Sequence, residues 1–106
     1  MCVRGDIYYV NLNEGRGSEQ SGTRPAVIIQ NNTGNQNSPT VIIATVTSAL
    51  KRYIPTHLRV QLKEPSIVLC EQIMTVDKTR LGEKVGKLTE EEMKQLNEKL
   101  KISLSL

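Results

Sequence analysis

Short runs of β-branched residues, separated by turn-forming residues, fill the first two-thirds of the chain. Val, Ile and Thr favour strands, and clusters of Gly, Asn, Ser and Pro favour turns. Short strands at such close spacing predict a small barrel or a strongly bent antiparallel sheet. The predicted strands are Asp6–Leu12, Ala26–Gln30, Thr40–Thr47, His57–Leu62 and Ser66–Met74, with a turn-rich connector over Asn31–Pro39.

The last third of the chain has the pattern of a helix. Thr89 and Glu92 form a capping box, in which each side chain can bond to the other residue's backbone amide. Apolar residues follow at helical spacing, and we expect one amphipathic helix packed on the sheet. The apolar positions are Met93, Leu96, Leu100 and Leu104, and one short helical turn is expected over Asp77–Leu81. The predicted fold class is mainly β with one C-terminal helix, in a single domain over residues 1–106.

Charge and aromatic content limit the kind of ligand. The formal net charge is +3, and all of the excess lies in residues 1–60. That asymmetry fits an anionic ligand bound by the first part of the chain, although ordinary solubilising charge fits the composition equally well. The chain has three Tyr and no Phe or Trp. A nucleic acid would therefore be held chiefly by Arg, Lys, amides and hydroxyls.

Cysteine spacing and the terminal sequence give no sign of a metal site or of export. Cys2 and Cys70 match no metal-binding spacing, and Cys70, inside an apolar run, is expected to be a buried core residue. The first residues lack the apolar segment of a signal peptide. No run approaches the roughly 20 apolar residues that span a membrane. We therefore expect a soluble protein of the reducing cytoplasm.

The segment Gly17–Asn31 places an arginine at the junction of a loop and a strand. A glycine-containing polar loop runs into Arg24 and Pro25, and the apolar run Ala26–Ile29 follows. Pro25 favours an extended conformation at Arg24, and functional groups are often held where a loop meets a rigid sheet. Arg24 is therefore the first candidate for a functional residue, with a surface salt bridge as the alternative.

Several kinds of catalytic site have no counterpart in the sequence. A single histidine, His57, excludes a nuclease that uses two imidazoles, and its alternating strand favours a structural role held by hydrogen bonds. We find no paired carboxylates, His/Cys cluster, nucleophile elbow or phosphate-binding fingerprint. An arginine with hydroxyls and amides remains. This set suits cleavage of RNA, whose 2′-OH is a nucleophile beside its own phosphodiester.

A hydroxyl near the arginine would complete such a site. A guanidinium can bond to two oxygens of the dianionic phosphorane, and a hydroxyl can donate a further hydrogen bond. Thr45 and Thr47 end the third predicted strand and lie on the same face. Thr47 is the better candidate because it is nearer the basic residues Lys51 and Arg52. Taken alone, a threonine in a strand is more often structural.

Six blocks of sequence, which together cover nearly the whole chain, form a recognisable series. They read RGDIYYVNL, GSEQSGTRPAVIIQN, SPTVIIATVTS, PTH, LCEQIMTVDKTRL and ISLSL. The most specific combination is SEQ-x-G-x-RP followed by a T-x-I-x-A-x-x-T strand. In content and order these blocks resemble the MazF/PemK toxins of bacterial toxin–antitoxin modules.

The resemblance implies both a fold and an activity. The fold would be a small SH3-like barrel of antiparallel strands, of the MazF/PemK/CcdB type, in a two-fold homodimer whose groove binds single-stranded RNA. The activity would be that of a sequence-specific mRNA interferase, which cleaves RNA by 2′-OH attack and needs no metal or other cofactor. The products would be 2′,3′-cyclic phosphate and 5′-OH ends. A cognate antitoxin is also implied, with a disordered acidic tail that lies across the groove.

The resemblance also assigns residues to roles. The family's catalytic Arg and Thr fall on Arg24 and Thr47. The loop that covers the RNA falls on Ser18, Glu19 and Gln20. The positions expected to line the base-reading groove are Asn31, Pro55, Thr56, Glu71 and Gln72.

Three other interpretations remain at this point. A toxin of the same fold, as in the CcdB group, could bind DNA gyrase and cleave nothing, although Arg24 and Thr47 argue against it. A catalytically silent RNA-binding barrel would need one of those two residues to be absent. A surface arginine on an unrelated small β domain fits the composition but not the order of the blocks.

Overall fold

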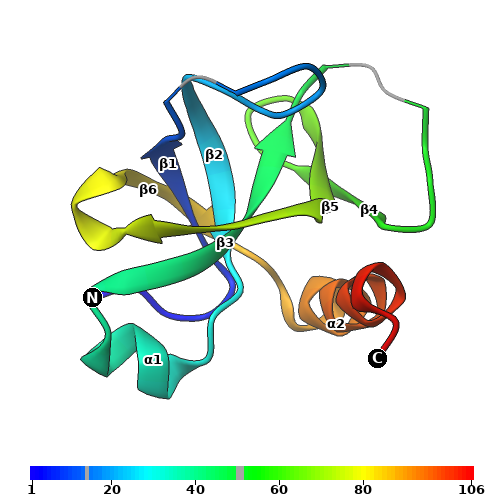
Figure 1. Cartoon of the computed structure of the whole chain (residues 1–106). Coiled ribbons are helices and arrows are strands. Elements are labelled where there is room, and N and C mark those ends of the chain that lie inside the picture. The colour runs from blue at the N-terminus through cyan, green and yellow to red at the C-terminus, as the bar shows by residue number, and fades with distance from the viewer. Residues whose placement is uncertain (14, 50–51) are drawn as a thin grey trace.

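The computed structural model describes residues 1–13, 15–49 and 52–106. Its strands form one antiparallel, strongly bent sheet in the order β4-β5-β3-β2-β1-β6 (Figure 1). Two α-helices and one turn of 3-10 helix, η1, complete the described structure. The elements are β1 (Asp6–Asn11), β2 (Thr23–Ile28), α1 (Asn32–Asn37), β3 (Thr40–Thr47), β4 (His57–Gln61), β5 (Pro65–Asp77), η1 (Lys78–Arg80), β6 (Leu81–Lys87) and α2 (Glu90–Leu104).

Both faces of the bent sheet are packed with aliphatic side chains. One cluster includes Ile7, Val27, Val46 and Val68, and Leu96 of α2 packs into it. The other cluster includes Val10, Ile28, Val41 and Ile43 on the opposite face. Strand alternation explains the division, since neighbouring residues of one strand point to opposite faces. The predicted aliphatic core and the mainly β fold class are therefore confirmed.

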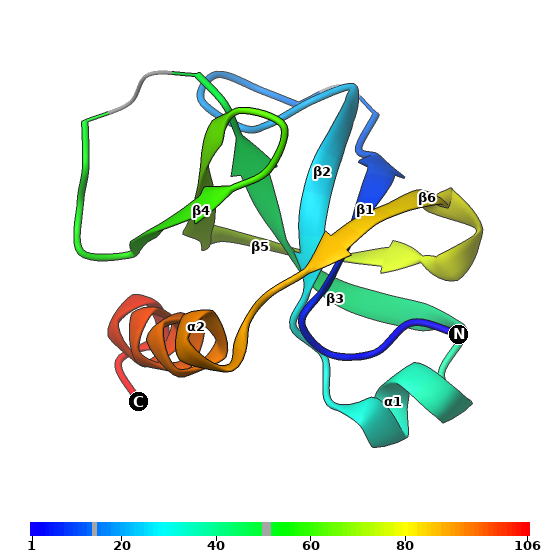
Figure 2. The same cartoon turned by 180° about the vertical axis from the view of Figure 1, so that it is seen from behind.

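The C-terminal helix forms as the sequence predicts. Thr89 Oγ1 accepts from the Glu92 amide at 3.1 Å, and Glu92 Oε1 accepts from the Thr89 amide at 2.9 Å. Leu96 is completely buried, while Leu104 is 54% exposed, so the predicted apolar stripe is only partly covered. Met93 packs on Gly5, where a Cβ would lie 2.6 Å from its sulfur. The helix contacts β4 and β5 and covers one face of the sheet (Figure 2).

The predicted connector Asn31–Pro39 contains a helix instead of only turns. Asn31 caps α1 by accepting from the Gly34 amide at 2.8 Å. Asn35 is buried, and its side chain donates to the Gln30 carbonyl at 3.0 Å. Asn, Gly and Ser are poor helix formers, so this helix depends on its cap and on one buried amide, which composition alone does not reveal.

Strand β6 was also absent from the sequence prediction. Its seven residues include Gly82, Gly86 and three charged side chains, a composition that disfavours strands. The strand forms because its backbone pairs with β1 at the edge of the sheet, with irregular register. Exposed charges are common at sheet edges, where they oppose pairing with another chain.

The other differences concern strand ends. β2 begins at Thr23 rather than at Ala26, and Arg24 and Pro25 lie within it, opposite Val10 and Tyr9 of β1. β5 runs on to Asp77, and the predicted short helical turn follows it as η1. The β1–β2 connection and the hairpin between β4 and β5 lie at one end of the molecule, opposite α1 (Figure 1).

Candidate functional site

A bulge in β5 presents two polar side chains beside the β1–β2 loop. Ala44 of β3 pairs with Ile73, but the next residue, Thr45, pairs with Leu69. Cys70, Glu71 and Gln72 therefore have no partner on β3 at the break in register. Bulges re-aim side chains and are common next to functional sites.

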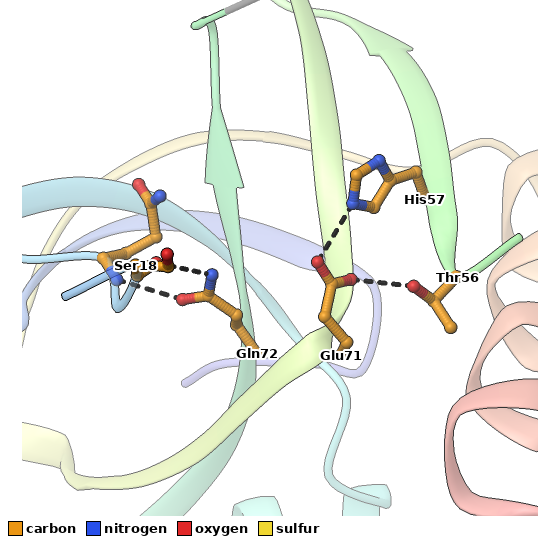
Figure 3. Close-up of polar contacts among 6 residues, drawn as sticks. Ser18, Thr56, His57, Glu71 and Gln72 are labelled. Atoms are coloured by element: carbon orange, nitrogen blue, oxygen red, sulfur yellow. Dashed lines mark hydrogen bonds and ion pairs between the residues drawn. The ribbon is translucent and has the colours of Figure 1, made fainter. Parts of the chain in front are cut away.

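Gln72 holds the β1–β2 loop against this bulge. Its Oε1 accepts from the Gln20 amide at 3.0 Å, and its Nε2 donates to the Ser18 carbonyl at 3.0 Å (Figure 3). The loop and the sheet form the walls of a pocket of about 440 Å³ that is open to solvent. Its lining residues are Leu12, Gly15, Arg16, Ser18, Glu19, Gln20, Thr45, Glu71, Gln72, Ile73 and Met74.

His57, the first residue of β4, and Thr56, which precedes it, both bond to the Glu71 carboxylate. Thr56 Oγ1 donates to Glu71 Oε1 at 2.9 Å, and His57 Nε2 donates to Oε2 at 2.9 Å (Figure 3). Partial burial acts to raise the pKa of Glu71, but hydrogen bonds from His57, from a backbone amide and from Thr56 outweigh it and hold the pKa below its usual value. Glu71 is thus fixed as a carboxylate.

His57 has the structural role that the sequence predicts. Its side chain is 4% exposed, and within the described residues Nδ1 has no hydrogen-bond partner. The hydrogen bond between Nε2 and Glu71 fixes the orientation of the imidazole ring. The histidine positions Glu71 and is not among the residues that line the pocket.

Arg24 lies at the start of β2, and one of its guanidinium nitrogens bonds to the loop before it. Nε donates to the Ser21 carbonyl at 3.1 Å. Within the described residues the side chain is exposed and forms no ion pair, so the surface salt bridge considered above is not observed there. Arg24 also borders a second pocket of about 210 Å³ with Val46 and Ser48, separate from the pocket beside Gln72.

The register of β2 and β3 relates Arg24 to Thr47. Ala26 pairs with Thr45. Counting two residues back along β2 and two forward along β3 gives Arg24 and Thr47, and strand alternation sets both on the same face of the sheet. Thr47 is 2% exposed, and its Oγ1 accepts from the Ala49 amide at 3.1 Å. Its hydroxyl proton is therefore left to donate elsewhere.

The predicted site residues fall into separate groups. Ser18, Glu19, Gln20, Glu71 and Gln72 share the pocket beside the bulge, and Thr56 joins them through Glu71. Pro55 is exposed beside Thr56.

Asn31 is not brought to this group. It lies beyond the other end of β2 from Arg24, where its side chain caps α1. Lys51, used above to favour Thr47, lies outside the described residues.

Among the pocket residues that the sequence did not assign to a ligand, Arg16 and Thr45 carry polar side chains, and Thr45 was considered only as the alternative to Thr47. Arg16 lines the pocket beside the bulge from the loop, and its position between two glycines in the loop was its signal in the sequence. Thr45 is 1% exposed, lines the same pocket and has no hydrogen-bond partner for its hydroxyl within the described residues. Its position on the Thr47 face follows from alternation, but its missing partner could not be foreseen.

Cys70 is a core residue, as predicted. It is fully buried, and burial, with a smaller effect of the Glu71 charge, raises the pKa of its thiol to about 12. Such a thiol is a poor nucleophile. Among the described residues no three His, Cys, Asp or Glu side chains gather in a metal-binding arrangement. No described helix has both the length and the apolar character needed to cross a membrane.

Comparison with known proteins gives a family match over almost the whole chain. Residues 3–104 match the family described as PemK-like, MazF-like toxin of type II toxin-antitoxin system. The chain is 48% identical over 112 aligned positions to the endoribonuclease MazF of Staphylococcus saprophyticus, with 100% of this chain and 93% of the relative covered.

Solved structures share the fold. An endoribonuclease from Mycobacterial species, in complex with its cognate antitoxin, superposes with a TM-score of 0.86 at 27% identity, covering 100% of this chain and 97% of that chain. MazF of Deinococcus radiodurans superposes with a TM-score of 0.84 at 23% identity, covering 99% and 97%. The bent sheet with its C-terminal helix is therefore the fold of these toxins.

Proposed function

The chain belongs to the PemK/MazF-like toxins of type II toxin–antitoxin systems, and from this premise we propose that it is a sequence-specific, metal-independent endoribonuclease. The substrate is single-stranded RNA, and the products are a 2′,3′-cyclic phosphate and a 5′-OH. One observation supports the proposal: the β2–β3 register pairs Ala26 with Thr45, and continued by two residues it would bring Arg24 and Thr47 together on one face of the sheet.

Arg24 stabilises the charge that develops on the phosphate. As the 2′-OH attacks, negative charge builds on the non-bridging oxygens, and a guanidinium can fork onto two of them. Within the described residues the side chain makes one hydrogen bond, from Nε to the Ser21 carbonyl, and this bond orients the guanidinium with its terminal nitrogens available to the phosphate. Arginine stays protonated at all ordinary pH values, so Arg24 acts as a charge and hydrogen-bond donor rather than as a base.

Thr47 supplies a second, neutral donor. The Ala49 amide occupies one lone pair of Oγ1, which orients the hydroxyl and directs its proton to a further acceptor. A phosphate oxygen near Arg24 would be that acceptor. Since the RNA brings its own nucleophile, positioning and charge stabilisation can supply the catalysis without a metal ion, and DNA is spared because it lacks the 2′-OH.

The pocket beside the bulge is proposed to read the bases. Ser18, Glu19 and Gln20 would cover the RNA, and Glu71 and Gln72 would face it. Base edges are read by hydrogen bonds, and Glu71 is fixed as an acceptor by His57 and Thr56. Thr56, which bonds to Glu71, and its neighbour Pro55 would extend the side of the pocket that Glu71 lines. The Asn31 side chain accepts a hydrogen bond from the Gly34 amide. Asn31 would therefore line the groove only if a second copy of the chain placed it there or if this helix cap opened.

We also propose a homodimer and an antitoxin partner. Ile42, Leu104 and Leu106 are exposed by 36%, 54% and 85%, and they border a mostly apolar groove of about 530 Å³ near the end of α2. A second copy would cover this surface. The antitoxin is inferred from the Mycobacterial relative, whose structure contains its cognate antitoxin. An acidic antitoxin tail would compete for the same basic groups as RNA.

The test is digestion of a long RNA in excess EDTA, followed by mapping of both product ends. The proposal expects cleavage at a short defined sequence, with 2′,3′-cyclic phosphate and 5′-OH ends, and no cleavage of DNA of the same sequence. An intact RNA, or cleavage that leaves 3′-OH ends, would contradict it. A gyrase-poisoning toxin of the same fold would leave the RNA intact and inhibit supercoiling by purified gyrase.

A further inference from the structure

Tyr53 carries two cations against its ring, outside the pocket that Gln72 closes. The guanidinium carbon of Arg59 lies 4.5 Å from the ring centre, and Lys99 Nζ lies 5.5 Å from it. Lys99 Nζ also donates to the Tyr53 hydroxyl at 3.3 Å. The three residues come from the connection before β4, from β4 and from α2. The fold, and not the sequence order, therefore assembles them.

This cluster is positively charged and open to solvent. Tyr53 is 44% exposed and Arg59 is exposed. The Arg59 guanidinium carbon and Lys99 Nζ are no more than 10.0 Å apart, because they lie 4.5 Å and 5.5 Å from the same ring centre. In the part of the chain that the structure describes, neither forms an ion pair. Like charges held this close repel each other, and a bound anion would relieve the repulsion.

The cluster continues the proposed RNA site. The Tyr53 ring meets the His57 ring edge to face, with centroids 6.1 Å apart and planes at 84°. His57 in turn bonds to Glu71, which also bonds to Thr56 (Figure 3). Tyr53 is therefore joined through His57 to the Glu71 side of the proposed RNA site, and Glu71 is the one carboxylate among these contacts.

We propose that Tyr53, Arg59 and Lys99 form an accessory RNA site that holds nucleotides flanking the cleaved sequence. This inference rests on the proposed function and extends its substrate contact beyond the base-reading pocket. The two cations bind phosphates, and the Tyr53 ring or the Arg59 guanidinium plane stacks on a base. Stacking tolerates any base, so the site adds affinity and not sequence preference.

An acidic peptide is the other anion that such a cluster could bind. The exposed ring favours RNA, because a nucleobase stacks on tyrosine and on guanidinium planes, whereas Asp and Glu side chains use only the charges. The test therefore measures RNA binding directly and includes an acidic peptide as a comparison.

The experiment compares two RNA lengths in the full-length protein. The short RNA spans only the mapped cleavage sequence, and the long RNA extends it by several nucleotides on each side. Both carry a single 2′-deoxy nucleotide at the scissile position, which blocks cleavage and leaves binding intact. Arg59→Gln/Lys99→Gln keeps much of each side-chain stem and removes both charges. Lys87→Gln/Lys94→Gln is the matched control, since Lys87 lies on the opposite edge strand and Lys94 points about 140° around α2 from Lys99.

The proposal expects the long RNA to bind wild type and the control more tightly than the short RNA. In Arg59→Gln/Lys99→Gln this gain should disappear, and the slope of log K against log salt for the long RNA should shrink by about 1.4, or about 0.7 for each single-strand phosphate that the variant no longer neutralises. Cleavage of an unmodified short RNA should not change. Tyr53→Leu should weaken long-RNA binding with little change in that slope.

Equal long-RNA affinity and salt slope in wild type and in a folded Arg59→Gln/Lys99→Gln variant would overturn the accessory site, even while both proteins cleave RNA. Loss of acidic-peptide binding alone would overturn it too, in favour of a peptide surface. If wild type neither binds nor cleaves any RNA, the proposed function itself fails, and with it this inference. The three results are therefore distinguishable.

Discussion

At the scale of single residues, Thr45 and Thr47 form a matched pair with opposite expected effects on stability. Both are buried on one face of β3, but only the Thr47 hydroxyl has a hydrogen-bond partner within the described residues. Thr45→Val removes an unsatisfied hydroxyl with little change of shape, so it should raise the free energy of unfolding by about 1 kcal/mol. Thr47→Val removes the partner of the Ala49 amide and should not raise it.

Chemical denaturation of the two variants checks this expectation. A clear loss of stability in Thr45→Val would show that the Thr45 hydroxyl has a partner in the folded protein, and a gain in Thr47→Val as large as that in Thr45→Val would show that the bond from the Ala49 amide contributes nothing.

Glu71 should make stability depend on acid pH. Its folded-state pKa is below its usual value, so its carboxylate stabilises the fold above the unfolded-state pKa of about 4.3, and this contribution is lost as the pH falls through the folded-state value. Thermal melts below about pH 5 should therefore show a steeper loss of stability in wild type than in Glu71→Gln. The effect should be modest because the side chain is 33% exposed.

Glu83→Gln, an exposed site on β6, is the control for general titration of carboxylates. If Glu71→Gln and Glu83→Gln follow the same acid profile, the hydrogen bonds from His57 and Thr56 do not stabilise the ionised form of Glu71.

At the scale of elements, the β5 bulge and the β1–β2 loop act together through Gln72. Gln72→Ala removes two bonds between its side chain and the loop backbone. We expect hydrogen exchange at the Gln20 amide to quicken by about 5-fold or more, since one hydrogen bond contributes about 1 kcal/mol. Exchange in β3 should not change. Gln95→Ala, on the exposed side of α2, is the control, and an unchanged Gln20 amide would show that other contacts hold the loop.

Elements with strong local signals could be predicted from the sequence. Thr40–Thr47 is a strand to the residue, and the capping box at Thr89 begins α2 as expected. Helix α1 and strand β6 could not be predicted, because a buried Asn35 and backbone pairing with β1 stabilise them against their composition. Local propensity does not include contacts made across the fold.

The candidate site likewise has one part that local sequence predicts and another that depends on contacts made across the fold. The position of Arg24 at a loop–strand junction is readable from Pro25 and the apolar run that follows. The pairing of His57 with Glu71 requires the β4–β5 register, in which His57 lies opposite Leu69, together with the bulge that turns Glu71 back toward it. Bulges leave no reliable mark on sequence alternation, so this contact appears only in the folded chain.

At the scale of the whole molecule, the apolar surface around Leu104 is expected to mediate the proposed dimer. Leu104→Glu places a charge in the apolar groove, whereas Ile102→Glu changes an equally exposed residue that does not line it. Light scattering after size exclusion should give a monomer for Leu104→Glu and a dimer for wild type and Ile102→Glu. Dimers in all three proteins would place the interface elsewhere.

The central claim is that Arg24 and Thr47 act on one phosphodiester. It is tested most directly by the single-turnover rate of cleavage of an RNA with one mapped site, in EDTA, for wild type, Arg24→Ala, Thr47→Val and the double variant. Each single change should slow cleavage by about 100-fold or more, and the double variant should lose less than the product of the two effects, because the groups share one transition state. Cleavage by Arg24→Ala at the wild-type rate would contradict the account.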